Sequence, residues 1–273
     1  MKFYKNPDFI ILCVLFLVNI VWDILLYLNP DHQTIWNYLL NASYGLMFLY
    51  AGVYGVLKGS TLDSASPIRK MMFWLGVAFV SWGAGLFTWT YYNLFLNIET
   101  PYPSLADILF IMAYPAIGLA CSYFIKFFKP LLTPKIIRDS VLLAVLATGF
   151  SFYVFNPSLS PELGFWEKFF NLAYPVGDSI IMSMAFMMFR IGVGRMQPGF
   201  LVFLGGLSVM IVADFAFAIQ TSKEVYWNGS ISDLLFIISI FIINLSMIMV
   251  VSSQTTESQF IGGNIAKESE IKV

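Results

Sequence analysis

Residues 8–28, DFIILCVLFLVNIVWDILLYL, are the stretch of sequence that decides the fold. A helix crosses a hydrocarbon core of about 30 Å with about 20 apolar residues, and this run is long enough. Lys2 and Lys5 precede it, as in a signal peptide, but no small-x-small cleavage site follows, and Asn19 and Asp23 interrupt the apolar run. We therefore expect a retained first helix that also directs insertion.

The composition of the whole chain is that of a membrane protein. Of the 273 residues, 59% are hydrophobic and only 11% are charged, whereas soluble domains carry about 25% charged residues. Aromatic residues make up 18% of the chain and are suited to membrane interfaces and helix packing. The predicted partner is therefore a lipid bilayer, and no nucleic-acid binding is predicted.

Apolar segments predict an all-α, polytopic membrane protein of eight transmembrane helices. They lack the alternation of apolar and polar residues that a β-barrel requires. The segments are residues 8–28, 35–57, 71–96, 105–128, 137–155, 166–190, 199–220 and 231–252. The fifth is short and contains Thr148, Gly149 and Ser151, so seven helices are the main alternative. Residues 1–252 would form the membrane domain, and residues 253–273 a polar cytoplasmic tail.

The basic residues predict the orientation in the membrane. Of the 15 Lys and Arg residues, all but Lys168 and Lys223 fall near the termini or in alternate connections. By the positive-inside rule, both termini would be cytoplasmic in a multi-pass protein of the cell membrane. Both termini on one side require an even number of crossings, which favours eight helices over seven.

Short matching sequences predict an internal repeat of four helices. The matches pair residues 103–111 (PSLADILFI) with 229–237 (GSISDLLFI), Asn41 with Asn171, and Tyr44 with Tyr174. Their order is kept, so residues of roughly 1–130 and 131–252 would be two repeats. Four crossings per repeat would insert both repeats the same way up, unlike the inverted repeats of many transporters.

Acidic residues within the predicted helices are the first candidates for function. An ionised Asp at the bilayer centre costs roughly 3 kcal/mol or more, so such groups normally face protein or a wet cavity. Asp107 and Asp233 each follow a serine by three residues, which predicts a capping box at a helix N-terminus. Asp178 and Asp214 have no such local explanation and are predicted either to line a cavity or to be protonated or hydrogen-bonded structural groups.

Other polar and aromatic residues extend this prediction to a binding site. Asn171, Tyr174 and Asp178 are spaced three and four residues apart and share one helix face. Pro175 lies among them and predicts a kink, because its ring removes a backbone hydrogen bond. The predicted ligand-binding residues are Asp178, Asp214, Asn171, Tyr174, Asp23, Trp82 and Asn41. They would line a polar, aromatic-rich cavity open to the outside, with hydrogen bonding between helices as the alternative.

The sequence contains no motif for catalysis or for metal binding. Walker, HExxH, GxSxG and CxxC motifs are absent, and the one histidine, His32, lies in a predicted loop. Cys13 and Cys121 lie in apolar runs, as small buried residues do. We therefore predict no catalytic residue, metal or cofactor, and expect a non-enzymatic protein. Asn228-Gly229-Ser230 is a glycosylation sequon in a predicted outer loop.

Several short motifs resemble a family of membrane sensors. Trp82 to Pro115, with Pro103-Ser104-Leu105-Ala106-Asp107 and Tyr114-Pro115, is similar to the multi-helix membrane sensor regions ahead of bacterial diguanylate cyclases and histidine kinases. Tyr174-Pro175-x-x-Asp178 and Ala213-Asp214 resemble later parts of that region. The resemblance implies a membrane part that senses a stimulus and passes it to a cytoplasmic output domain. Here only the short polar tail is expected after residue 252, so a partner would carry the signal.

These observations leave several hypotheses of function. The leading one is a non-enzymatic membrane sensor or ligand-binding module, with a small or lipophilic ligand in an outward-facing cavity and a cytoplasmic signalling partner. A small-molecule transporter or permease is the alternative, because buried Asp residues and internal repeats also occur in transporters. A lipid-modifying enzyme and an accessory subunit of a membrane complex are the remaining candidates.

Overall fold

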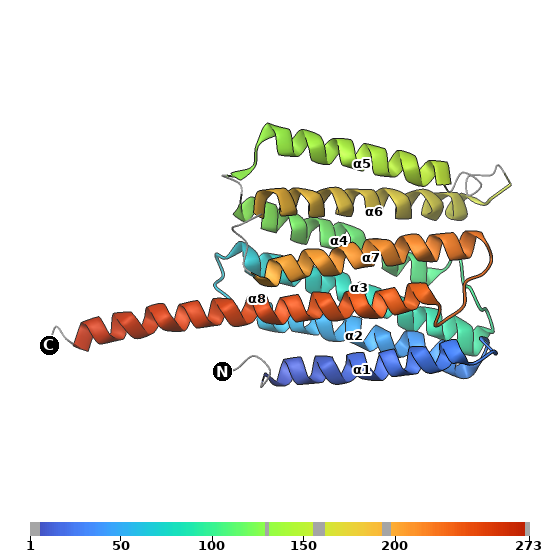
Figure 1. The fold of residues 1–273 in the computed structure, drawn as a ribbon, viewed down its shortest axis with the longest axis horizontal. Coiled ribbons are helices and arrows are strands. Elements are labelled where there is room, and N and C mark those ends of the chain that lie inside the picture. The colour runs from blue at the N-terminus through green and yellow to red at the C-terminus, as the bar shows by residue number, and fades with distance from the viewer. Residues whose placement is uncertain (1–5, 129–130, 155–161, 193–197, 271–273) are drawn as a thin grey trace.

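In the part of the chain that the structure describes, eight long helices run side by side in one bundle (Figure 1). The computed structural model of the protein describes residues 6–128, 131–154, 162–192 and 198–270, except the side chains of residues 127 and 254–270. The helices are α1 (Pro7–Leu28), α2 (Ile35–Gly59), α3 (Pro67–Leu96), α4 (Leu105–Phe127), α5 (Pro134–Val154), α6 (Phe165–Gly192), α7 (Pro198–Ser222) and α8 (Ile231–Glu270). All eight are long and apolar enough to span a membrane, and the described ranges contain no strand. The predicted all-α fold with eight spans is confirmed, and the seven-helix alternative is wrong.

Capping residues and prolines set where the helices begin. Ser66 accepts a hydrogen bond of 3.2 Å from the backbone N–H of Ile68, and Pro67 occupies the first turn of α3. This cap starts α3 at Pro67, ahead of the predicted segment of residues 71–96. At α4, the Asp107 carboxyl accepts from the N–H of Ser104 over 2.7 Å, which confirms the predicted capping box.

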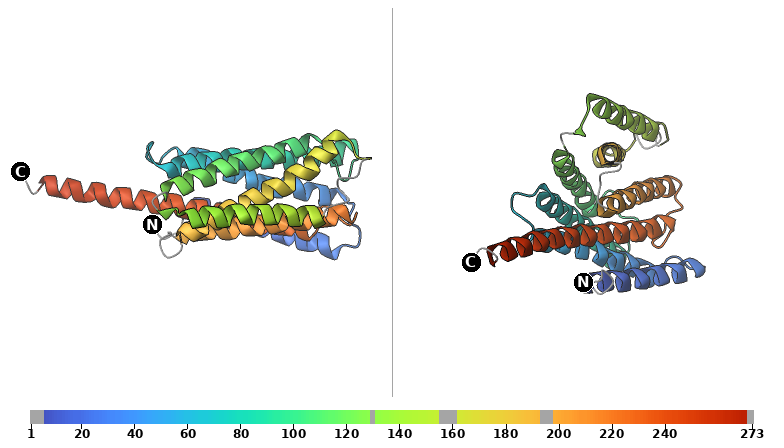
Figure 2. Two further views of the ribbon diagram at one scale, coloured as in Figure 1. Left: turned by 90° about the horizontal axis from the view of Figure 1, so that it is seen from above. Right: turned by 60° about the vertical axis from the view of Figure 1, so that its left-hand side comes forward.

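The last helix is much longer than its predicted membrane span. α8 continues to Glu270 and projects beyond the other helices at the end of the bundle where α1 begins (Figure 1 and Figure 2). The residues predicted to form a polar tail from 253 onward therefore continue the helix as far as residue 270. This stretch contains no proline that would stop a helix.

Helices α2 and α3 approach closely through facing glycines. A Cβ atom added to Gly52 would lie 2.9 Å from the carbonyl oxygen of Gly76, and one added to Gly76 would lie 2.8 Å from that of Gly52. Small residues let helix backbones meet in a membrane, where packing rather than the hydrophobic effect holds helices together. This close contact fixes the position of α2 relative to α3.

The helices divide into central and peripheral ones (Figure 1 and Figure 2). α3 packs between α2 and α4, and α8 packs against α1, α2 and α7. α5 packs against α6 at the edge of the bundle, and its exposed side chains include Val145, Leu146 and Tyr153. The first four helices meet the last four where α1 and α2 contact α8 and where α4 contacts α6.

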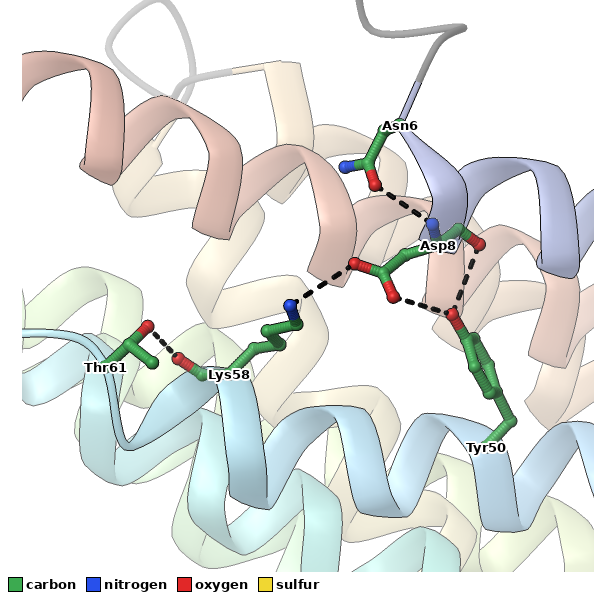
Figure 3. A network of polar contacts seen from close by, with 5 residues as sticks. All are labelled: Asn6, Asp8, Tyr50, Lys58 and Thr61. Atoms are coloured by element: carbon green, nitrogen blue, oxygen red, sulfur yellow. Dashed lines mark hydrogen bonds and ion pairs between the residues drawn. The ribbon is translucent and has the colours of Figure 1, made fainter.

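A small polar network fixes the start of α1 against α2 (Figure 3). The Tyr50 hydroxyl lies 3.2 Å from both the backbone oxygen and Oδ1 of Asp8. Lys58 Nζ lies 3.6 Å from Asp8 Oδ2, and the N–H of Asp8 donates to the Asn6 side chain over 3.0 Å. A partly exposed ion pair adds at most about 1 kcal/mol, so the network mainly sets where the helix begins.

Candidate ligand-binding site

A cavity of about 610 Å³ lies inside the bundle. It lies toward the end formed by loops 29–34, 97–104 and 223–230, which we call the predicted outer end because the positive-inside rule places it outside. Thr100, Tyr102 and Glu224 are exposed loop residues and also line the cavity, so it reaches the surface there. Its volume is within the range of about 300–1,000 Å³ typical of small-molecule sites.

All but one of the predicted ligand-binding residues line this cavity. The lining residues among them are Asn41, Trp82, Asn171, Tyr174, Asp178 and Asp214. Asp23 is not part of the lining, because α1 packs outside α2 and α8 and its buried face meets these helices. Asp23 is buried on α1, and its Oδ1 has no hydrogen-bond partner among the described residues.

Asp178 on α6 and Asp214 on α7 form a carboxyl pair in the wall. Both carboxyl groups line the cavity and lie close enough to interact, and the Tyr114 hydroxyl donates to Asp178 Oδ1 over 2.8 Å. The close approach of Tyr114 depends on Gly177, where an added Cβ would lie 2.5 Å from the Tyr114 ring.

Two similar hydrogen bonds connect the first four helices to the last four at the cavity. Tyr44 on α2 donates to Asp233 Oδ1 on α8 over 3.0 Å. Tyr174 on α6 donates to Asp107 Oδ1 on α4 over 2.9 Å. The sequence matches pair Tyr44 with Tyr174 and Asp107 with Asp233. The two bonds are therefore equivalent, because in each a tyrosine of one half donates to the aspartate of the other half. Each aspartate thus serves two purposes, as a helix cap and as an acceptor for the opposite half.

Asn228 organises the wall next to Tyr44. Its Oδ1 accepts from Asn41 Nδ2 over 2.6 Å, from Trp89 Nε1 over 3.2 Å and from the Tyr226 hydroxyl over 3.1 Å. Only 3% of Asn228 is exposed, so in the folded protein it is inaccessible for glycosylation. The bond to Asn228 orients the Asn41 amide and leaves Asn41 Oδ1 buried, without a partner among the described residues.

Aromatic rings form a large part of the remaining wall. The Trp82 ring lies 5.5 Å from the ring of Phe110 and 5.8 Å from that of Phe236, measured between centroids. These two phenylalanines are paired by the sequence matches, so they flank Trp82 from the two halves. Trp89 makes edge contacts with Phe217 and Tyr226 farther toward the loops.

The charges in the lining are all acidic. The carboxyl groups belong to Asp107, Asp178, Asp214, Glu224 and Asp233, and the described lining contains no Lys, Arg or His. Lys168 and Lys223, the predicted outer basic residues, are not part of it.

Two tyrosines in the loops at the mouth of the cavity, Tyr102 and Tyr226, are neutral hydrogen-bond donors. Burial raises the pKa of Tyr102, and the charges of Asp107 and Glu167 raise it further. Burial and the charge and hydrogen bond of Asp233 raise the pKa of Tyr226 in the same way. Both hydroxyls therefore keep their protons at neutral pH, and Tyr102 donates to Asn171 across the rim.

Sequence reasoning missed several lining residues, among them Tyr44, Trp89, Tyr102 and Tyr226. Tyr44 could have been predicted as a site residue, because the sequence matches pair it with Tyr174. Tyr102 and Tyr226 lie in loops, where helix periodicity gives no information on direction.

Comparisons with protein-family models, curated proteins and solved structures give no match for this chain. The fold and the spans define its class as a multi-pass α-helical membrane protein. Within the described residues, no group of His, Cys, Asp or Glu is placed to hold a metal ion.

Proposed function

We propose that this chain is a membrane-embedded binding module that holds a small molecule in the cavity at the predicted outer end. The observation that carries the proposal is the convergence of side chains from α2, α3, α4, α6, α7 and α8 on the cavity. Such a site, in which aromatic side chains lie beside a few directed polar groups, is typical of small-molecule binding.

A sensor role for the module is supported by the position of α8. Asp233 and Phe236, in the first turns of α8, line the cavity. The same helix runs through the bundle and extends beyond it at the opposite end (Figure 1). A ligand that shifted α8 would therefore move a segment on the predicted cytoplasmic side, where a signalling partner would bind.

The predicted repeat is part of this proposal. Contacts within the first half, α1–α2, α2–α3 and α3–α4, have counterparts in α5–α6, α6–α7 and α7–α8. The contact of α2 with α8 likewise corresponds to that of α6 with α4. Together with the exchanged tyrosine–aspartate bonds, these contacts support two parallel repeats with the cavity between them.

The test is to purify the protein in lipid nanodiscs and identify bound molecules by mass spectrometry. We expect a small molecule that wild-type protein retains and that the variant Asp214→Asn loses. Asp31→Asn, an exposed carboxyl on a loop of the same end, is the matched control and should retain it. Recovery of the same lipids and nothing else from all three proteins would count against the binding function.

Transport is the second candidate, and the Asp178–Asp214 pair favours it. Two neighbouring carboxyl groups in a cavity wall could couple proton release to substrate binding. Proteoliposomes with an entrapped pH dye would report such coupling when the recovered ligand is added. A transporter gives ligand-driven proton movement that Asp178→Asn abolishes, whereas a sensor binds the ligand without any flux.

A further inference from the structure

We propose that the cavity selects a protonated organic amine with an apolar or aromatic body. This inference rests on the proposed binding function and specifies the chemical class of its ligand. Three features of the wall lead to it, namely its charge, its hydrogen-bond acceptors and its aromatic rings.

The charge of the wall favours a cation. Five carboxyl groups line the cavity, and the described lining contains no basic side chain. Tyrosine hydroxyls and backbone N–H groups satisfy Asp107 and Asp233 as acceptors but do not neutralise them. Carboxylates away from water are stabilised by an opposite charge, and the protein supplies none within the wall. A positively charged ligand would supply it.

The hydrogen-bonding capacity of the wall favours a donor. Asp178 and Asp214 are partly exposed and line the cavity, and their carboxyl oxygens can accept hydrogen bonds. An ammonium N–H can donate to them, whereas a carboxylate or a quaternary ammonium cannot.

The rings and the size of the cavity favour an organic body over a bare ion. Trp82, with Phe110 and Phe236 beside it, and Trp89 present aromatic surface to a space of about 610 Å³. Tryptophan rings attract cations and also bury apolar groups. The described carboxyl groups are not grouped in a way that would hold a metal ion.

The test compares three probes of similar shape and different charge: 2-phenylethylamine, 2-phenylethanol and 3-phenylpropionate. Ala218→Cys places a thiol in the cavity wall, in a background that carries Cys13→Ala and Cys121→Ala. Labelling by N-ethylmaleimide in nanodiscs then reports occupancy, since a bound probe shields the thiol. Val225→Cys is the control, because Val225 is 57% exposed at the same end and does not line the cavity.

The amine should protect Ala218→Cys at a concentration at least tenfold lower than the alcohol, and the carboxylate should not protect at all. None of the probes should slow the labelling of Val225→Cys. Equal or better protection by the alcohol or by the carboxylate would overturn the inference and leave the binding function intact. If no probe protects the thiol, the inference is overturned. If wild-type protein also retains no molecule on purification, the proposed binding function is overturned as well.

A second measurement uses the chain without substitutions and so does not depend on how the cysteine variants fold. The amine should raise the midpoint of thermal unfolding, and the alcohol and carboxylate should leave it unchanged. The shift should disappear in Asp214→Asn and persist in Asp31→Asn. A shift of the same size with the alcohol would again contradict selection for charge.

Discussion

The hydroxyl group of Tyr44 on α2 donates to Oδ1 of Asp233 on α8 over 3.0 Å, and this bond spans most of the chain length. Asp233 also accepts from the N–H of Gly229 over 2.7 Å, so one carboxyl group caps α8 and fixes α8 against α2. The bond from Tyr174 to Asp107 does the same for α4 and α6. The cavity lies where these two junctions meet, and its shape therefore depends on both.

The first prediction concerns the equivalence of these two bonds. Tyr44→Phe and Tyr174→Phe each remove one hydroxyl donor and keep the ring, so each should lower the free energy of unfolding by about 1 kcal/mol. Equilibrium unfolding in mixed detergent micelles measures the change. Tyr153→Phe is the control, since Tyr153 is 83% exposed on α5 and should show no effect. A large loss from one of the two substitutions and none from the other would contradict the equivalence.

The second prediction concerns the approach of α2 to α3. In Gly52→Ala, the new Cβ would lie 2.8 Å from the Val80 nitrogen and 2.9 Å from the Gly76 oxygen, and these backbone atoms cannot move separately from their helix. We expect the helices to separate at a cost of about 1–3 kcal/mol, seen as a lower thermal unfolding midpoint. In Gly205→Ala the new Cβ meets no atom within 4 Å, and helix propensity should leave stability unchanged or slightly higher. Equal effects of the two substitutions would contradict this account of the α2–α3 contact.

The helices were predictable because spanning segments follow a simple physical rule. A run of about 20 apolar residues needs no knowledge of its neighbours to be identified as a span. The Ser104–Asp107 capping box was predictable for the same reason, since its contacts are local in sequence. The added length of α8 was not, because a polar stretch gives no periodic apolar signal to mark where a helix ends.

The cavity was predictable only in part. Asp178 and Asp214 could be identified as candidates because an acidic side chain within a membrane span must face protein or water. Sequence spacing could not show that they line the same cavity, because α6 and α7 approach through tertiary packing. Asn228 matched a glycosylation sequon, and only the fold shows that it is a buried acceptor for three donors.

The third prediction concerns that acceptor. Asn228→Ala leaves Asn41 Nδ2 and Trp89 Nε1 without the oxygen to which they donate, whereas Tyr226 keeps Asp233 as an acceptor; buried donors without partners are costly. We expect a loss of about 2–3 kcal/mol in the free energy of unfolding and a red shift of tryptophan emission as water replaces the acceptor. Gln33→Ala removes an exposed side-chain bond at the same end and should cost less than about 0.5 kcal/mol. A neutral Asn228→Ala would mean that the network does not hold the wall.

The last prediction concerns orientation, on which an outward-facing cavity depends. Gln33 and Ser64 are exposed in the loops before and after α2, so a helix that spans the membrane places them on opposite sides. The distribution of basic residues predicts that Gln33→Cys, in the background without native cysteines, reacts with an impermeant maleimide on intact cells. Ser64→Cys should react only after the membrane is permeabilised. The opposite pattern would mean that the cavity opens toward the cytoplasm. Its acidic and aromatic wall would then bind a cytoplasmic ligand.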